Sequence, residues 1–136
     1  MVIRYEMKRE NLENLEIYKI VRELNRDVWD IYKELKNEFK FSIGQQFLRS
    51  IDSIGANIAE GFGKYHYLDS VKFYYNTRGS LWESKYWLSL LNERSQISNE
   101  KYKIMRENLD KLGVKLNNFI TNIKIRAKKI TTNNNK

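Results

Sequence analysis

The sequence contains no cysteine and no proline, and only six of its 136 residues are glycine. Without cysteine, the chain forms no disulfide and offers no thiolate nucleophile and no cysteine ligand for zinc. Without proline, the residue that most strongly breaks helices, long helices can run uninterrupted. Charged residues make up 31% of the chain, and strand-like alternation is not evident. These features predict an all-α protein.

Other absences limit the compartment and the chemistry. No run approaches the roughly 18 apolar residues of a membrane-spanning helix, and the first ten residues lack the apolar region of a signal peptide. We therefore expect a cytoplasmic protein with no membrane partner. The single histidine, His66, falls in a predicted loop, where it provides neither a catalytic triad nor the paired Glu-x-x-His motifs of a di-iron bundle. We predict no metal, no cofactor and no enzymatic activity. An enzyme with an active site between subunits stays as a third hypothesis.

Apolar residues recur at alternating spacings of three and four along four segments, a pattern that predicts amphipathic helices at about 14–37, 42–63, 69–94 and 98–128. Short links between such helices are typical of an up-down-up-down four-helix bundle. We expect the bundle to span residues 12–128, between a basic segment at 1–11 and a disordered polar tail at 129–136. The predicted core comprises Ile17, Val21, Leu24, Val28, Ile31, Leu35, Phe47, Ile51, Ile54, Ile58, Phe62, Phe73, Tyr74, Thr77, Leu81, Ser84, Leu88, Leu91, Met105, Leu109, Leu112, Leu116, Phe119 and Ile123.

Several residues predict how the helices begin and end. Ser42, with a glutamine three residues later, and Ser98 have the features of helix N-caps. Gly61 and Gly63 predict a left-handed end to the second helix. Gly55 lies inside that helix, where glycine costs about 1 kcal/mol relative to alanine, so we expect a neighbouring helix to approach closely there.

A second apolar stripe on the third helix lies outside its predicted core seam. It consists of Tyr75, Gly79, Trp82 and Tyr86, at spacings of four, three and four. Exposed aromatic stripes usually mark an interface, so we interpret this one as a contact between subunits. The alternatives are a surface on which nucleic-acid bases stack and a part of the core that the seam assignment misses.

A set of polar residues on the second and third helices lies close to the apolar seams. We interpret it as a hydrogen-bonded or ion-paired network that fixes helix register and subunit geometry. The alternative is a ligand or nucleotide pocket at the subunit boundary. The set consists of Arg49, Asn57, Glu60, Arg78, Ser80 and Glu83.

The positive charge is concentrated at the ends of the chain. The net charge is +8, and residues 124–136 carry five basic residues and no acid, which leaves only +3 for the rest. In an up-down bundle both termini lie at one end, where repeated weak phosphate contacts add up. We predict nucleic-acid binding driven by charge, without base reading, because no recognised reading motif is present. A solubilising end is the alternative. The predicted phosphate contacts are Arg4, Lys8, Arg9, Lys124, Arg126, Lys128 and Lys129.

Two motifs carry a family resemblance. Gln46-Phe47-Leu48-Arg49 leads into the run Ser-Ile-Gly-Ala-Asn-Ile-Ala-Glu-Gly at 53–61, and Gly-Ser-Leu-Trp-Glu follows at 79–83. Over roughly residues 12–127 the sequence resembles the bacterial four-helix-bundle family of 23S ribosomal RNA intervening-sequence proteins. It departs from the family pattern at Gly55, where proline is usual, and at Leu48, where a second arginine is usual.

The resemblance implies a homo-oligomer, with a ring-like pentamer as the expected form. The fold is also similar to the accessory variability protein of diversity-generating retroelements, a basic pentamer that binds nucleic acid and a reverse transcriptase. We therefore predict a non-enzymatic, homo-oligomeric accessory protein. Its expected partners are RNA or DNA, and a protein such as a reverse transcriptase. The alternative function is a protein-interaction scaffold that binds no nucleic acid.

Overall fold

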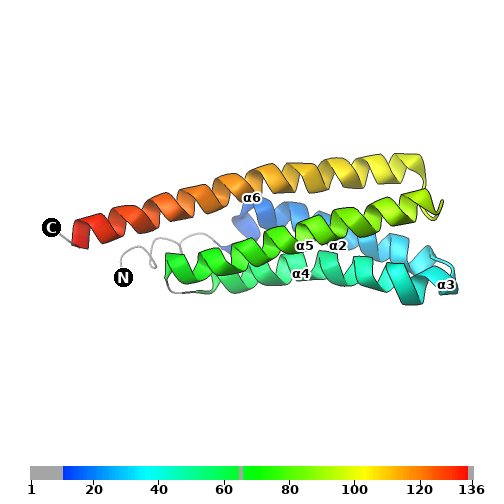
Figure 1. Ribbon diagram of the computed structural model, residues 1–136, viewed down its shortest axis with the longest axis horizontal. Helices are drawn as coiled ribbons and strands as arrows, with labels where there is room; N and C mark the ends of the chain where they lie inside the picture. The colour runs from blue at the N-terminus through cyan, green and yellow to red at the C-terminus, as the bar shows by residue number, and fades with distance from the viewer. Residues whose placement is uncertain (1–10, 65, 135–136) are drawn as a thin grey trace.

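Four long helices, packed side by side and running alternately in opposite directions, form the body of the molecule (Figure 1). The computed structural model describes residues 11–64 and 66–134, and this part contains no strand. α2 packs against α4 and α6, and α5 packs between α4 and α6, so each helix has two neighbours. The predicted all-α, four-helix fold is thus confirmed. The elements are η1 (Leu12–Asn14), α2 (Glu16–Glu34), α3 (Asn37–Phe39), η2 (Lys40–Gly44), α4 (Gln45–Phe62), α5 (Tyr67–Glu93) and α6 (Asn99–Asn134).

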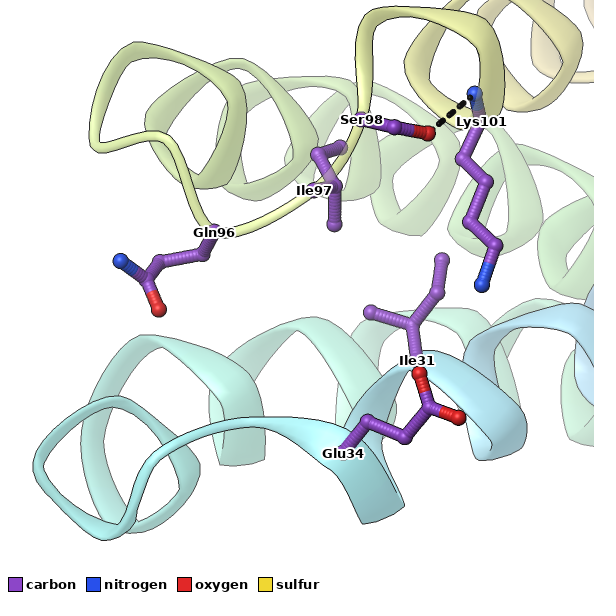
Figure 2. Close-up of a pocket in the computed structure, with 6 residues that line it drawn as sticks. All are labelled: Ile31, Glu34, Gln96, Ile97, Ser98 and Lys101. Atoms are coloured by element: carbon purple, nitrogen blue, oxygen red, sulfur yellow. Dashed lines mark hydrogen bonds between the residues drawn. The ribbon is translucent and has the colours of Figure 1, made fainter.

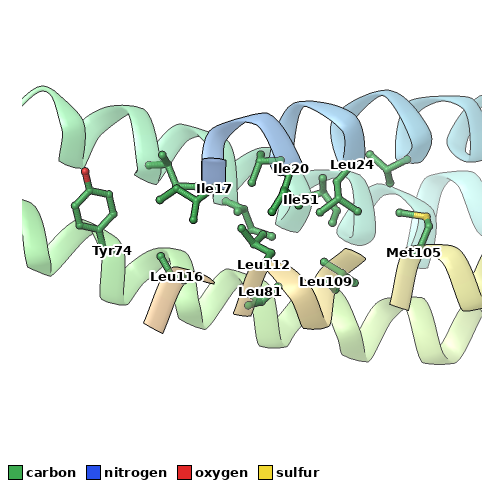
Figure 3. Packing of buried hydrophobic residues seen from close by; sticks show 14 of the residues in the cluster. Ile17, Ile20, Leu24, Ile51, Tyr74, Leu81, Met105, Leu109, Leu112 and Leu116 are labelled. Carbon is green, nitrogen blue, oxygen red and sulfur yellow. The ribbon is translucent and has the colours of Figure 1, made fainter. Parts of the chain in front are cut away.

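The interior is built from one apolar face of each long helix, as the spacing predicts (Figure 3). Most of the predicted core residues are buried, but Phe62, Phe73 and Phe119 are only half-buried. Ile20 and Ile120, which lie beside the predicted seams, are buried instead. A helix of a globular bundle buries an arc of about 100° or more, which is wider than a heptad seam.

α4 begins differently from the expected capped start. The predicted link at 38–41 is helical, and η2 forms a π-helical turn that leads directly into α4. Ser42 is therefore no N-cap: its hydroxyl donates to the Glu38 carbonyl oxygen at 2.7 Å, one turn back. A Cβ added to Gly44 would lie 2.6 Å from Leu35 Cδ1 and 2.8 Å from the Phe39 carbonyl oxygen. Glycine at position 44 thus allows this wide turn to pack tightly.

The end of α4 also corrects a prediction, because no described glycine has a positive φ. Gly63 has φ −74° and donates to the Ala59 carbonyl oxygen, so the helix ends in right-handed geometry. Gly61 lies inside α4, where its missing side chain makes room for Tyr74 of α5. The close approach expected at Gly55 is confirmed, because an added Cβ there would lie 3.1 Å from Val21 Cγ1 of α2. Ser98 is confirmed as a cap, since its Oγ accepts from the Lys101 backbone N–H at 3.1 Å.

α6 continues to Asn134, so residues 129–134 are helical where the sequence predicts a disordered tail. Thr131 and Thr132 donate their hydroxyls to the carbonyl oxygens of Ala127 and Lys128, one turn back. Ala127 is buried and Ile130 packs partly against the core, so apolar spacing continues into the predicted tail. The last turns of α6 extend past the ends of the other helices (Figure 1).

Candidate nucleic-acid and subunit interface

The aromatic stripe of α5 lies on the outside of the bundle, beside α6. The exposed fraction is 63% for Trp82 and 56% for Tyr86, and nothing lies within 4 Å of a Cβ added to Gly79. Val114 of α6 is also 63% exposed. The alternative that this stripe belongs to the core is therefore wrong for these α5 residues. Only Tyr75 is half-buried, with its ring partly packed against the core.

A shallow groove of about 270 Å³ runs between α5 and α6 beside this stripe. Gly113 keeps the two helices close here, because a Cβ added to it would lie 3.3 Å from Leu81 Cδ2. The walls combine apolar, cationic and anionic side chains. They are Arg78, Leu81, Trp82, Lys85, Asp110, Gly113, Val114 and Asn117.

Cations lie over the aromatic rings of this surface. The Lys85 ammonium is 4.6 Å from the centroid of the Trp82 ring. The Arg78 guanidinium and the Lys124 ammonium are each 4.8 Å from the centroid of the Tyr75 ring. Such contacts contribute about 0.5–1 kcal/mol each when exposed. The structure thereby joins the predicted subunit stripe to one of the predicted phosphate contacts.

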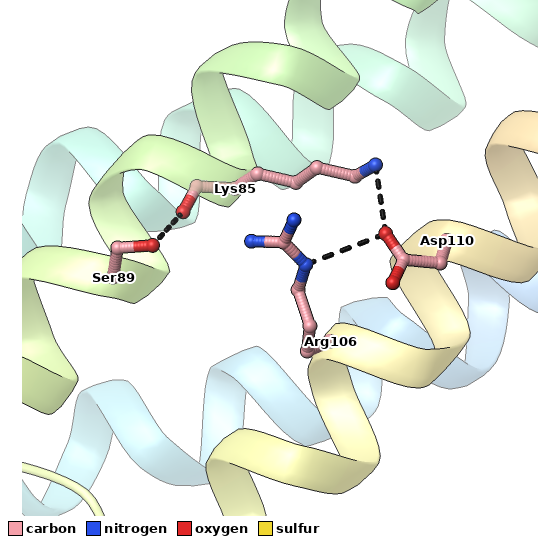
Figure 4. Close-up of polar contacts among 4 residues, drawn as sticks. All are labelled: Lys85, Ser89, Arg106 and Asp110. Carbon is pink, nitrogen blue, oxygen red and sulfur yellow. Dashed lines mark hydrogen bonds and ion pairs between the residues drawn. The ribbon is translucent and has the colours of Figure 1, made fainter.

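One carboxylate of the groove, that of Asp110, holds two cations (Figure 4). Asp110 Oδ1 accepts from Lys85 Nζ at 2.8 Å and from Arg106 Nε at 3.3 Å. The hydrogen bond from Lys85 is the main reason that the pKa of Asp110 lies below its usual value. Ser89 donates its hydroxyl to the Lys85 carbonyl oxygen at 2.9 Å. Lys85, Arg106 and Asp110 were not among the predicted site residues, although the four-residue spacing of Arg106 and Asp110 indicates an ion pair on one helix.

The predicted polar network does not form as one unit. Its part between α4 and α5 consists of small hydroxyl groups: Ser53 Oγ lies 3.0 Å from Ser80 Oγ, and Asn57 Nδ2 donates to the Ser53 carbonyl oxygen at 2.9 Å. One turn further, Ser84 Oγ donates to Ser50 Oγ at 2.9 Å inside the bundle. This seam binds two helices of one chain, which supports the structural interpretation for Asn57 and Ser80.

The other members of that set lie elsewhere. Glu60 pairs with Lys64 on the surface of α4, and Glu83 accepts from Trp87 Nε1 at 3.1 Å. Arg49 is exposed and makes no ion pair within the described part of the chain. The set separates because neighbouring positions on a helix point in different directions: Gly79 faces outward, Ser80 faces α4 and Leu81 enters the core.

The basic end of α6 presents four cations to solvent. Lys124, Arg126, Lys128 and Lys129 are exposed, and no acidic residue follows position 123. Lys124 and Lys128, four residues apart, share a face with the groove, whereas Arg126 and Lys129 face other directions. The predicted contacts Arg4, Lys8 and Arg9 lie outside the described residues. The structure therefore places the four C-terminal cations on one projecting helix.

A second pocket of about 290 Å³ lies at the opposite end of the bundle, between α2 and the loop before α6 (Figure 2). It is lined by Ile31 and Glu34 of α2 and by residues around the Ser98 cap, among them Lys101. None of the predicted site residues lines it. Its lining consists of two isoleucines, one glutamine, one serine, one acidic residue and one basic residue.

The core and the loops add little reactive chemistry. The Tyr74 hydroxyl is buried without a hydrogen-bond partner among the described residues, and burial raises the pKa of this phenol above its usual value. The described residues contain no cluster of three or more metal-ligating side chains. His66 is exposed at the start of α5. No helix in the described ranges has the length and apolar character needed to cross a membrane.

Comparisons with known proteins agree with this architecture. A solved structure from Bacteroides thetaiotaomicron VPI-5482, a protein of unknown function from the S23 ribosomal protein family, is similar with a TM-score of 0.72 and 29% sequence identity. The similarity covers 77% of this chain and 95% of that one. No curated protein sequence matches the chain. The sequence pattern of the family described as 23S rRNA-intervening sequence protein matches residues 13–118, which is most of the chain, so the protein belongs to that family.

Proposed function

We propose that this protein is a non-enzymatic, homo-oligomeric accessory protein that binds RNA or DNA through basic terminal segments. The observation that carries the proposal is the projecting end of α6, with Lys124, Arg126, Lys128 and Lys129 exposed and no acid among them. Phosphate contacts of this kind are independent of base sequence and weaken steeply with salt. The ribosomal RNA context in the family description is consistent with such a partner.

Assembly is the second part of the proposal. Gly79, Trp82 and Tyr86 of α5, with Val114 of α6, expose apolar surface that one chain leaves uncovered. A second copy of the chain covering this surface removes it from water. An oligomer also presents the basic ends several times, so weak individual contacts combine into a strong interaction. The expected pentamer and the similarity to the retroelement accessory protein remain predictions.

A triple variant that removes three positive charges from the end of α6 tests the nucleic-acid part of the proposal. For single-stranded RNA, the logarithm of the binding constant falls linearly with the logarithm of the salt concentration, and each phosphate contact contributes about 0.7 to the slope. We therefore expect Arg126→Gln/Lys128→Gln/Lys129→Gln to lower the magnitude of this slope by about 2 for each subunit in contact. The measurement is fluorescence anisotropy with labelled RNA and with duplex DNA over a range of salt concentrations. Substitution isolates charge better than truncation, because truncation after residue 120 also removes the buried Ile123 and Ala127.

The matched control is Lys101→Gln/Lys103→Gln/Lys111→Gln, which removes the same charge from exposed positions in the first half of α6. We expect this control to bind with nearly the wild-type salt dependence. An equal fall of the salt dependence in the two triple variants would show that only the net charge of the protein matters, and not the position of the lysines and the arginine on α6. Absence of any binding at low salt would leave the alternative function, a protein-interaction scaffold, which the uncovered apolar surface at Trp82 favours.

A further inference from the structure

Two cations from different helices converge on one aromatic ring beside the groove between α5 and α6. Arg78 of α5 and Lys124 of α6 each lie 4.8 Å from the centroid of the Tyr75 ring. Arg78 Nη1 also donates to Asn117 Oδ1 at 3.1 Å, which ties the guanidinium to α6. The ring thus brings two positive groups to within 9.6 Å of each other at most, the sum of the two 4.8 Å distances.

Neither cation has a carboxylate partner among the described residues, whereas Lys85 of α5 and Arg106 and Lys115 of α6 do. Lys85 and Arg106 share Asp110, and Lys115 pairs with Glu16 at 2.7 Å. The carboxylate of the groove is therefore already held by two other cations. A π face and a neutral amide orient Arg78 and Lys124, but they carry no net charge to neutralise them.

We propose that Arg78 and Lys124, positioned by Tyr75 and Asn117, form a binding site for neighbouring phosphate groups of a nucleic-acid backbone, one at each cation. The inference rests on the proposed function and specifies it. Arg78 uses one nitrogen for Asn117, and the rest of its planar fork stays available for two phosphate oxygens. Lys124 supplies a second charge at the same ring, for the next phosphate. Bound phosphates neutralise both cations, whereas the aromatic ring carries no net charge with which to do so.

The site continues into the basic end of α6. Lys128 lies one turn beyond Lys124 on the same face, at an axial distance of about 6 Å for four helical residues. A backbone that occupies the Arg78 site therefore meets Lys128 next and then leaves the bundle along the projecting helix (Figure 1). This track assigns Tyr75 and Arg78 to the ligand rather than to the predicted subunit contact. It leaves Gly79, Trp82 and Tyr86 for the second copy.

The test compares the double variant Arg78→Gln/Lys124→Gln with the wild-type protein, using a labelled uridine homopolymer in a salt titration. We expect the slope of the logarithm of the binding constant against the logarithm of the salt concentration to be shallower by about 1.4 per subunit in contact. At 0.1 M salt this corresponds to an affinity about 25-fold lower. The charge-preserving variant Arg78→Lys/Lys124→Arg is expected to keep the wild-type slope. The control is Arg94→Gln/Lys103→Gln, which removes one arginine at the end of α5 and one lysine from α6 at exposed positions.

Three outcomes separate this inference from the proposed function. If the wild-type protein binds RNA, and the double variant and the control bind it with equal affinity and salt dependence, the phosphate site is overturned and the proposed function stays intact. Binding of inorganic polyphosphate but not of RNA, abolished in the double variant, supports a phosphate site and overturns the nucleic-acid function. A fall in oligomer mass of the double variant on light scattering assigns these residues to subunit contact and overturns the site.

Discussion

Replacing Trp82 with glutamate is expected to convert the assembly into single chains of 16.4 kDa. Trp82 is 63% exposed on one chain and lies beside Gly79, whose outer side is open. In the proposed contact a second copy covers both residues, so a glutamate there loses its water without gaining a partner. An uncompensated buried charge costs about 3–5 kcal/mol, and a symmetric assembly meets that cost at every interface. Light scattering coupled to size-exclusion chromatography measures the mass.

Trp29→Glu is the matched control, because Trp29 is a similarly exposed tryptophan, 50% accessible, on α2. It stacks on Tyr32 within its own helix and belongs to no predicted contact. We expect this variant to keep the wild-type mass. An unchanged mass for Trp82→Glu would remove the α5 stripe from the interface. Dissociation in both variants would point to a general effect of surface charge.

Replacing Gly61 with alanine is expected to lower the free energy of unfolding by about 1–3 kcal/mol, the usual cost of overpacking a core. A Cβ at this position would lie 2.9 Å from Tyr74 Cζ and 3.2 Å from the Ser70 carbonyl oxygen. The Tyr74 ring cannot move away easily, since it is fully buried and packs edge-on against Phe119 at 4.9 Å. Urea unfolding followed by circular dichroism measures the change.

Gly79→Ala provides the opposite result on the neighbouring helix. Nothing lies within 4 Å of its added Cβ, so the higher helix propensity of alanine is expected to stabilise the fold by up to about 1 kcal/mol. The two glycines thus differ in sign for the same chemical change. Equal destabilisation by both substitutions would contradict the packing described for Gly61. The comparison is made on the stability of the chain, and the oligomer mass is recorded alongside it because Gly79 lies in the proposed contact.

Sequence spacing predicted the helices and their buried faces well, because burial of an apolar stripe repeats with the period of the helix itself. Each predicted seam contains residues that are buried in the structure, such as Val21, Ile54, Leu88 and Leu112. The ends were harder to predict. Ser98 caps α6 as expected, whereas Ser42 lies within a π-helical turn that depends on the contact between Gly44 and Leu35. The tail of α6 was missed because its polar composition hides the continued spacing of Ile123, Ala127 and Ile130.

The candidate site was predicted only in pieces. Tyr75, Arg78 and Lys124 were each singled out, but in three separate sets: the aromatic stripe, the polar network and the phosphate contacts. These residues meet because of the axial offset between α5 and α6. The close contact between Gly113 and Leu81 is part of the packing that fixes this offset. The polar set was divided for the same reason, since Ser80 meets Ser53 of α4 while Arg78 meets Asn117 of α6.

The sequence by itself determined the all-α class, the four amphipathic helices, most of the core residues and the concentration of positive charge near the C-terminus. These properties depend on local periodicity and on composition, which every stretch of chain carries within itself. Only the tertiary structure decided that the aromatic stripe lies outside the core, that Gly61 receives the Tyr74 ring, and that Arg78 and Lys124 meet at Tyr75 without a carboxylate. Such contacts join residues far apart in the chain, and they depend on the axial offset between packed helices. The sequence of a single helix does not encode this offset.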